Sequence, residues 1–138
     1  MWYYLSLGSN LGEREEHLNA AKQLIGQQIG PITRCSSFYY SEPWGFDSPN
    51  VFCNLCCAVE TALSPIDMLH ATQAIEHALG RTHKSFNGQY SDRIIDIDLI
   101  RAFDGDTELF VNTEELTIPH PLWQEREFVC IPLSEITT

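Results

Sequence analysis

The segment VFCNLCCAVET (residues 51–61), followed by SPIDMLHATQAIEHALG (residues 64–80), sets the expected architecture of the chain. The first part has the composition of a β-strand. The second part has the clearest helix boundaries in the sequence: Ser64 suits the N-cap, Pro65 suits the first helical position, and Asp67 completes a capping box. Four residues at helical spacing form the expected buried stripe, namely Met68, Thr72, Ile75 and Leu79.

The flanking sequence extends this strand-and-helix unit in both directions. Strands are expected over residues 2–7, 32–40 and 94–103, and a further helix over residues 13–27. The turn at residues 104–106 predicts a hairpin with residues 107–111. The order β-α-β-β-α-β predicts a ferredoxin-like α+β sandwich, in which an antiparallel sheet carries the helices on one face, followed by a C-terminal hairpin and a short helix. Residues 1–138 are expected to form a single domain.

Composition and charge exclude several classes of protein. With 43% apolar residues the chain is too apolar to be intrinsically disordered. Eight Lys and Arg against 19 Asp and Glu give a net charge of −11, which repels a nucleic-acid backbone. Without a leader or a long apolar run, we expect a cytoplasmic protein that does not enter membranes. Five of the eight cations lie in the second half of the chain: Arg81, Lys84, Arg93, Arg101 and Arg126.

The five cysteines include one C-x-x-C pair, Cys53 and Cys56, a spacing that is found in both redox and zinc-binding sites. In a strand, residues three apart point to opposite faces, so these two thiols would not reach one ion. An odd number of cysteines also argues against a disulfide framework. We therefore expect buried, reduced cysteines that act as small apolar residues.

The chemistry is concentrated in residues 92–100, DRIIDIDLI. Asp96 and Asp98 alternate with apolar residues, so both carboxylates lie on one strand face, about 6.6 Å apart at ~3.3 Å per residue. Like charges so close repel unless a cation lies between them, and Mg²⁺, which prefers carboxylate and phosphate oxygens, is the natural candidate. A merely solvated strand face is the alternative.

Five separate motifs, in order, resemble one known family. They are Gly8-Ser-Asn-Leu-Gly12, Ser36-Ser-Phe-Tyr39, Asn54, Asp92-Arg-x-x-Asp-Ile-Asp98 and Pro119-His120. Together they are similar to the 6-hydroxymethyl-7,8-dihydropterin pyrophosphokinases of folate biosynthesis, over about residues 3 to 135. That family has the ferredoxin-like fold expected above. The resemblance implies transfer of diphosphate from ATP to the pterin hydroxymethyl group, with release of AMP.

The resemblance also implies roles for individual residues. Asp96 and Asp98 are expected to hold two Mg²⁺ ions. The implied catalytic residues are Arg81, Lys84, Arg93, Asp96 and Asp98. The implied ATP-binding residues are Gln73, Glu76, Arg93, His120 and Arg126. The polar, glycine-containing segment 81–92 is expected to be a lid over the substrates.

A flat pterin needs aromatic faces and a hydrogen-bonding edge. The resemblance implies that Asn54 binds that edge while Phe52 and Phe128 sandwich the ring. The implied pterin site also includes Ser41, Glu42 and Trp44. Structural alternatives stay open: a local hydrogen bond for Asn54, and ordinary core packing for the two phenylalanines.

Three of the implied ATP-binding residues have structural alternatives as well. Glu76 suits a solvated helix face, Arg126 has acidic sequence neighbours to pair with, and His120 is placed to cap a turn. Two other functions compete with the pyrophosphokinase interpretation. One is a different Mg²⁺-dependent phosphoryl transferase or hydrolase, and the other is a non-catalytic ligand-binding module. The protein is expected to act as a monomer on small molecules.

Overall fold

The computed structural model describes residues 1–42, 50–80 and 94–137. The strands are β1 (Trp2–Ser9), β2 (Ile32–Cys35), β3 (Tyr39–Ser41), β4 (Phe52–Glu60), β5 (Asp96–Asp104), β6 (Thr107–Leu109), β7 (Val111–Asn112) and β8 (Thr117–Ile118). The helices are α1 (Arg14–Gln28), α2 (Pro65–Ala78) and α3 (Glu127–Ile136), with a short 3₁₀ helix, η1 (Trp123–Glu125).

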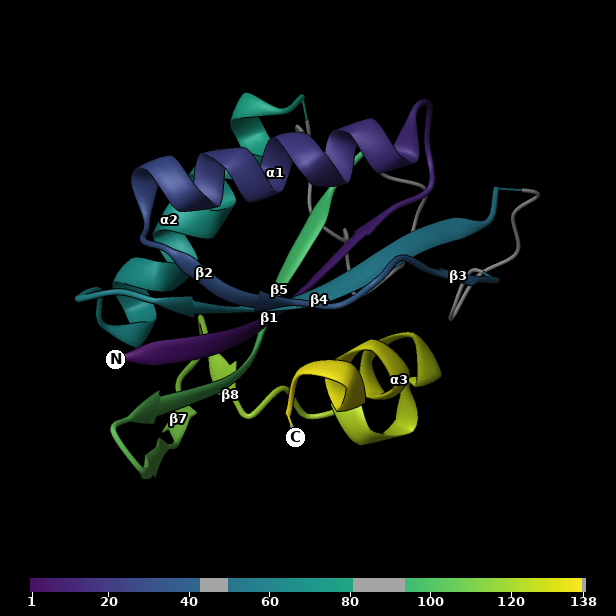
Figure 1. The fold of residues 1–138 in the computed structure, drawn as a ribbon. Helices are drawn as coiled ribbons and strands as arrows, with labels where there is room; N and C mark the ends of the chain where they lie inside the picture. The colour runs from purple at the N-terminus through teal and green to yellow at the C-terminus, as the bar shows by residue number, and fades with distance from the viewer. Residues whose placement is uncertain (43–49, 81–93, 138) are drawn as a thin grey trace.

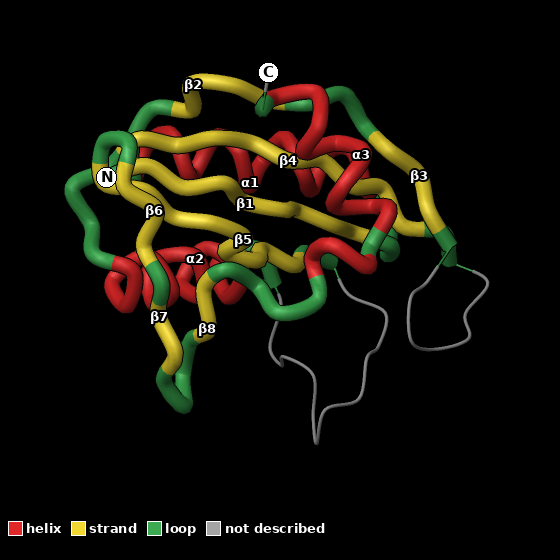
Figure 2. Tube along the Cα trace, turned by 90° about the horizontal axis from the view of Figure 1, so that it is seen from below, coloured by secondary structure: helices red, strands yellow, loops and turns green. Residues whose placement is uncertain are grey.

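The main sheet is antiparallel and has the strand order β2-β4-β1-β5-β6, with β3 also paired to β4. Helices α1 and α2 cover one face and α3 lies across the other (Figure 1). The view from below shows α3 lying over the strands on the side away from α1 and α2 (Figure 2). The expected α+β sandwich with an antiparallel sheet is therefore confirmed. The expected hairpin is confirmed by the pairing of β5 with β6.

Helix α2 follows its predicted boundaries. The Ser64 hydroxyl accepts a hydrogen bond from the Asp67 backbone N–H at 3.4 Å, and Pro65 occupies the first turn. Of the predicted stripe, Met68, Thr72 and Ile75 are buried, and Leu79 packs partly buried against the core.

The prediction of one unbroken strand over residues 32–40 is wrong, because β2 and β3 are separate strands joined by Ser36–Phe38. Ser36 leaves the regular ladder: its hydroxyl accepts from the Cys56 N–H at 2.9 Å, while its own N–H donates to the Cys56 carbonyl at 2.9 Å. The next residue, Ser37, donates its N–H and hydroxyl to Glu135 of α3 at 2.9–3.0 Å. These contacts replace ladder pairing and break the strand.

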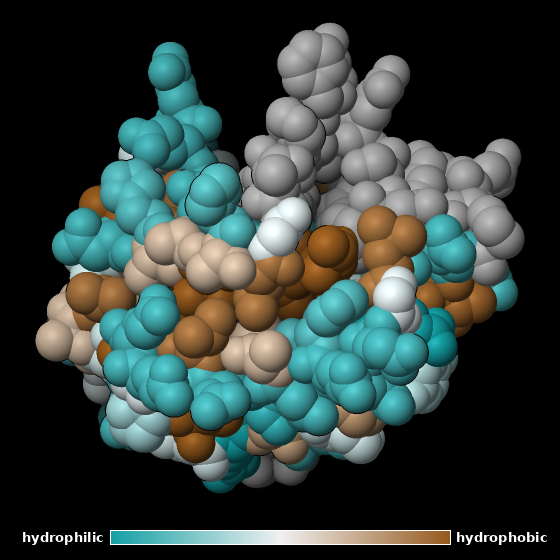
Figure 3. Space-filling model, turned by 90° about the horizontal axis from the view of Figure 1, so that it is seen from above, coloured by the Kyte–Doolittle hydropathy of each residue, from teal (hydrophilic) through white to brown (hydrophobic). Residues whose placement is uncertain are grey.

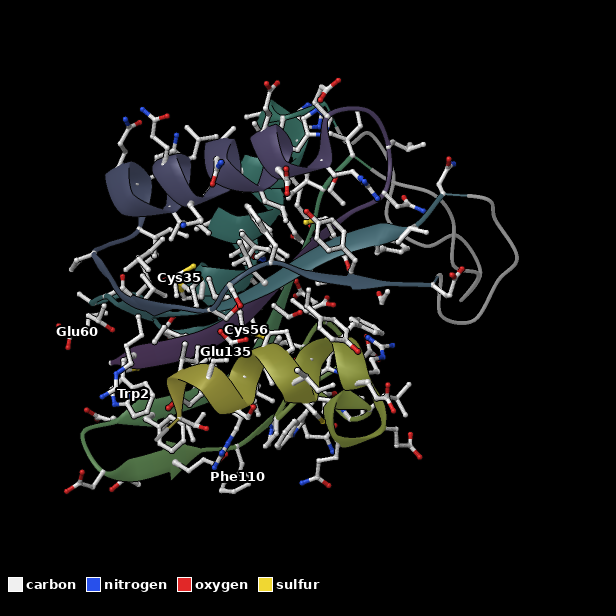
Figure 4. The ribbon with its side chains drawn as sticks, turned by 45° about the vertical axis from the view of Figure 1, so that its right-hand side comes forward. Trp2, Cys35, Cys56, Glu60, Phe110 and Glu135 are labelled. Carbon is white, nitrogen blue, oxygen red and sulfur yellow. The ribbon has the colours of Figure 1, made fainter. Side chains whose placement is uncertain are left out.

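Two apolar layers hold the fold together, one on each face of the sheet. The larger layer joins β1, β4 and β5 to α1 and α2, and the smaller one lies under α3. Cys53 belongs to the first layer and Cys56 to the second, which confirms that the two thiols point to opposite faces. Figure 4 shows Cys56 between the sheet and α3. All five cysteines are free thiols, and burial raises the pKa of Cys56 to about 12.

The face that carries α1 and α2 is polar at its rim and keeps apolar side chains between the helices (Figure 3). Leu24 and Leu69 of these helices, and Leu79 directly after α2, are partly buried and pack against the core beneath. In the parts of the chain that the structure describes, no helix has the length and apolar character to cross a membrane.

Candidate active site

The site is built on neighbouring positions of three strands. Gly8 of the central strand β1 pairs with Asn54 of β4 on one side and with Asp96 of β5 on the other. Two residues back along β1, Ser6 lies between Cys56 and Asp98. Because side chains two apart along a strand share a face, Asn54, Asp96 and Asp98 all lie on the α3 side of the sheet.

The two aspartates alternate with core residues, as the sequence predicts. Ile95, Ile97 and Leu99 are at most 5% exposed and belong to the layer under α1 and α2, whereas Asp96 and Asp98 are half-buried. The carboxylates therefore point away from that layer. A β-bulge follows: Leu5 pairs with Leu99 but Tyr4 pairs with Arg101, so Ile100 is the extra residue and packs under α3.

The carboxylate pair suits Mg²⁺ better than a metal that needs a closed protein cage. Among the described residues, no cluster of three or more His, Cys, Asp or Glu side chains has the geometry to hold a metal. Mg²⁺ typically binds through one or two carboxylates, waters and substrate phosphates. Two half-buried aspartates on an accessible strand face fit that pattern.

Asn54 is 2% exposed and held in one orientation. Its side-chain amide donates to the Tyr39 carbonyl at 3.0 Å and to the Ser41 hydroxyl at 2.8 Å, both on β3. The structural hydrogen bonds that were the alternative interpretation of Asn54 are therefore present. They use the amide hydrogens and turn Oδ1 toward Gly8, where an added Cβ would lie 2.9 Å from it. Oδ1 is thus the atom oriented to accept from a ligand.

Aromatic residues lie beside this amide. Phe52 pairs with Ser41 and sits on the same face as Asn54, with its ring 3.5 Å from where a Gly8 Cβ would be. Phe128, in the first turn of α3, packs partly buried on the same side of the sheet. The guanidinium of Arg126, which is 6% exposed, lies 5.7 Å from the Phe128 ring centroid. Glu42, by contrast, is exposed at the end of β3.

A cleft of about 220 Å³ lies along the outer edge of β5. Its walls come from four parts of the chain: Leu69 of α2, Ile97–Leu99 of β5, Glu115–Thr117 around β8, and His120–Pro121. This volume is below the ~300 Å³ at which drug-sized pockets begin, so the cleft suits one end of a larger ligand. Asp98 belongs both to this cleft and to the carboxylate pair.

His120 has a defined orientation in the cleft. Its backbone N–H donates to the Ile100 carbonyl at 2.9 Å, and its Nδ1 accepts from the Leu122 N–H at 3.2 Å. The structure therefore confirms that His120 caps a turn, which was one of its two interpretations. Because Nδ1 is the acceptor, the neutral ring carries its proton on Nε2, which makes Nε2 a donor.

Two neighbouring residues of α2 differ sharply. Glu76 is only 3% exposed, and its carboxylate accepts from the Ile97 backbone N–H at 2.7 Å. The alternative of a solvated Glu76 is therefore wrong: its carboxylate binds the β5 backbone between the two aspartates. Gln73, one turn earlier, is exposed.

Four of the implied site residues lie outside the described residues, namely Trp44, Arg81, Lys84 and Arg93. The expected lid over residues 81–92 also lies outside them. The structure brings five of the implied site residues onto one face of the sheet: Ser41, Phe52, Asn54, Asp96 and Asp98. His120 lies in the cleft that Asp98 also lines.

The sequence did not predict the place of Gly8 beside Asn54, nor the cleft walls other than Asp98 and His120. The sequence predicts a strand that ends at residue 7, but β1 continues to Ser9. A glycine inside a strand indicates that another group approaches closely. The sequence carries this signal at Gly8 if the strand is taken to include that residue. Leu69, Leu116 and Thr117 carried no signal, because ordinary apolar and hydroxyl residues become a wall only when distant segments meet.

An antiparallel α+β sandwich with a carboxylate pair between an amide-and-aromatic surface and a separate cleft has a layout that suits a two-substrate transferase. The chain matches the family model described as 7,8-dihydro-6-hydroxymethylpterin-pyrophosphokinase (HPPK) over residues 4–138. The chain belongs to this pyrophosphokinase family.

Individual relatives agree with that assignment. A 2-amino-4-hydroxy-6-hydroxymethyldihydropteridine pyrophosphokinase of Porphyromonas gingivalis is 47% identical, over 96% of this chain and 88% of that protein. One from Bacillus subtilis is 37% identical, over 96% of this chain and 76% of its own length. Among solved structures, an HPPK-DHPS in complex with substrates has a TM-score of 0.72 at 14% identity, covering 98% of this chain and 40% of that longer one. At such low identity that structure supports the fold alone.

Proposed function

We propose that this protein transfers diphosphate from ATP to 6-hydroxymethyl-7,8-dihydropterin in folate biosynthesis. In that reaction the pterin hydroxyl oxygen bonds to the β-phosphorus, the bond from that phosphorus to the α–β bridging oxygen breaks, and AMP leaves. The observation that carries the proposal is the position of Asp98. It stands next to Asp96 on the Asn54 face and also lines the cleft at the edge of β5.

The pterin half of the proposal rests on the surface around Asn54. Oδ1 of Asn54 accepts a hydrogen bond from the pterin edge, while Phe52 and Phe128 contact the two ring faces. Gly8 supports this arrangement, because the lack of a side chain leaves room beside Oδ1. Ser41 acts through Asn54, whose amide it holds at 2.8 Å, and Glu42 and Trp44 complete the proposed pterin site.

The nucleotide half rests on the cleft. Its apolar wall at Leu69 and Leu116 suits a purine ring, and His120 offers its Nε2–H to an oxygen or nitrogen of ATP. Asp98 both lines the cleft and belongs to the carboxylate pair, so the cleft adjoins that pair. Glu76 acts as a positioning residue, because it holds the Ile97 backbone between the two aspartates. Gln73 and Arg126 complete the proposed ATP-binding residues.

Asp96 and Asp98 are the residues that would hold Mg²⁺, with two ions expected. The metal would neutralise charge on the phosphates, and catalysis of this kind consists mainly of positioning and charge stabilisation. Arg81, Lys84 and Arg93 belong to the same proposal as additional catalytic cations. A single pyrophosphokinase domain over residues 1–138, acting as a monomer in the cytoplasm, is proposed with them.

The decisive test is incubation with ATP, Mg²⁺ and 6-hydroxymethyl-7,8-dihydropterin, with separation of the nucleotide products. AMP together with the pterin diphosphate is the expected result. ADP would instead indicate an ordinary kinase, and absence of any Mg²⁺-dependent turnover would favour a binding module.

Asn54→Leu sharpens the test of the pterin site. Loss of a buried hydrogen-bonding group costs about 1–3 kcal/mol, so pterin affinity is expected to fall far more than ATP affinity. Titration calorimetry with each ligand measures both. An equal loss of the two affinities, in a variant that is still folded, would contradict the role assigned to Asn54.

A further inference from the structure

The first turn of α1 reaches across to the two strands that carry the proposed pterin site. Gly12, with a φ of 66°, turns the chain from β1 into this helix. Arg14 then donates from Nη1 to the Val51 carbonyl at 2.7 Å. Its guanidinium carbon also lies 5.5 Å from the centroid of the Tyr40 ring. One side chain therefore contacts both the middle residue of β3 and the residue that precedes β4.

A second residue of the same turn completes the arrangement. The Tyr40 hydroxyl hydrogen-bonds to the Glu15 carboxylate, and this bond raises the pKa of Tyr40 to about 12. Just before the helix, the Asn10 side-chain amide donates to the Asn50 carbonyl at 3.3 Å. We refer to Arg14, Glu15 and Tyr40 as the clamp. The contact between Asn10 and Asn50 lies beside it, because Asn50 directly precedes Val51, which Arg14 binds.

The register shows what this clamp acts upon. Tyr40 pairs with Cys53, while its neighbours Tyr39 and Ser41 pair with Asn54 and Phe52. Because side chains alternate along strands, Tyr40 lies on the α1 side of the sheet. Asn54 and Phe52 lie on the other side. The clamp therefore holds these strands from behind, without occupying the face on which the pterin is proposed to bind.

We propose that Arg14 is a positioning residue for the pterin site, an inference that rests on the proposed function. By holding the Val51 carbonyl and the Tyr40 ring together, it sets the relative position of β3 and β4. That position determines where Ser41 and Phe52 stand relative to Asn54. Arginine suits the role because its planar guanidinium donates hydrogen bonds and stacks on a ring at the same time, which a lysine ammonium does less well.

The test compares Arg14→Met with Arg34→Met. Arg34 also donates a hydrogen bond to a backbone carbonyl, that of Ile136 at 3.0 Å, but it does so at the C-terminal end of α3. Binding of a non-hydrolysable ATP analogue with Mg²⁺ is measured first. Binding of 6-hydroxymethyl-7,8-dihydropterin is then measured with the analogue saturating, and the midpoint of thermal unfolding is recorded for each variant.

For Arg14→Met we expect pterin affinity to fall about tenfold, while affinity for the ATP analogue stays within twofold of wild type. Arg34→Met should leave both affinities within twofold, even where its thermal midpoint falls as far. Arg14→Lys should recover part of the pterin affinity. Tyr40→Phe keeps the ring that Arg14 contacts and removes the hydroxyl that bonds to Glu15, so its loss should be smaller than that of Arg14→Met.

Two outcomes would overturn the inference. One is an Arg14→Met protein whose pterin affinity stays within twofold of wild type. The other is a loss that is equal for pterin and ATP analogue, or matched by Arg34→Met, since either would mark a merely structural role. Failure of the proposed function itself is distinguishable, because it would appear as wild-type protein that neither binds the pterin nor forms AMP.

Discussion

Along the α3 side of the sheet, the strands β1, β4 and β5 carry apolar side chains beneath the helix and polar ones beyond it. Beneath the helix, Tyr4, Cys56 and Ile100 pack against α3. Elsewhere on this face the same strands present Asn54 and the two aspartates; on the central strand, Gly8 lies between Asn54 and Asp96, and Ser6 lies beside Asp98. Solvent alone does not explain this change, because Asn54 is only 2% exposed. Burying an amide costs free energy unless it is hydrogen-bonded, and the Asn54 amide is held by Tyr39 and Ser41; this is the end of the sheet at which we propose that the ligands bind.

The largest effect is expected at the polar end. Asp96→Ala or Asp98→Ala should lower AMP formation by on the order of 10²–10³-fold, as losses of charge-stabilising groups do. The fold should survive, because the core-facing Ile95, Ile97 and Leu99 are unchanged and one of two repelling charges is removed. Rates and unfolding curves check this, with the exposed Asp104 of the same strand as a matched control. Near-normal turnover in both variants would disprove the assignment.

Metal linkage gives an independent measure of the same pair. Excess Mg²⁺ with a non-hydrolysable ATP analogue should raise the wild-type midpoint of thermal unfolding, by mass action. Either alanine variant should be protected much less. Protection as strong as that of wild type would show that the pair does not hold the metal.

The opposite result is expected at the apolar end. Leu133 of α3 is 3% exposed, so Leu133→Ala should lower the free energy of unfolding by about 2–4 kcal/mol through lost burial and a cavity. Pterin and nucleotide affinities of the folded protein should not change. Denaturant titration checks the first statement, with Ile131→Ala on the exposed side of the same helix as a nearly neutral control. A large loss of pterin or nucleotide affinity in folded Leu133→Ala protein would show that the residues packed under α3 also contribute to ligand binding.

Gly8 marks the polar end on the central strand. A Cβ there would lie 2.9 Å from Asn54 Oδ1, and two hydrogen bonds hold that amide in place. Gly8→Ala should therefore weaken pterin binding about tenfold, roughly 1.4 kcal/mol, and leave ATP binding unchanged. Gly26→Ala is the matched control, because a Cβ there meets nothing within 4 Å. Unaltered pterin affinity in Gly8→Ala would mean that the Asn54 amide moves without consequence.

The smallest effect is expected at the far end of β5, beyond the bulge. Arg101 donates to Glu108 at 2.9 Å, and this hydrogen bond holds the pKa of Glu108 below its ordinary value of 4.5. A carboxyl whose pKa is lowered by folding stabilises the protein above its unfolded pKa, and the stabilisation is lost as pH falls through the folded pKa.

Glu108→Gln should accordingly cost about 0.5 kcal/mol of unfolding free energy at pH 7. The difference from wild type should shrink as the pH is lowered to 3, because the stabilisation is lost as the pH falls through the lowered pKa of Glu108. Unfolding titrations at both pH values check this, and a difference that persists in acid would show that the pair acts through packing instead.

Local patterns were sufficient for much of this protein. The alternation around Asp96 and Asp98 placed both carboxylates on one face, because side-chain direction repeats every two residues in any strand. The limits of α2 followed from Ser64 and its neighbours, because capping uses hydrogen bonds between residues a few positions apart. The opposite orientations of Cys53 and Cys56 followed from the same period of two.

Only the tertiary structure decided the remaining features. The break between β2 and β3 depends on Ser36 meeting Cys56 and on Ser37 meeting Glu135, and those partners are 20 and 98 residues away. The burial of Glu76 depends on the Ile97 backbone, 21 residues along the chain. Gly8 became part of the site only when Asn54 and Asp96 paired on either side of it. Contacts between such distant residues leave no periodic trace in the sequence, because they depend on which strands pair, and in which register, once the whole core is packed.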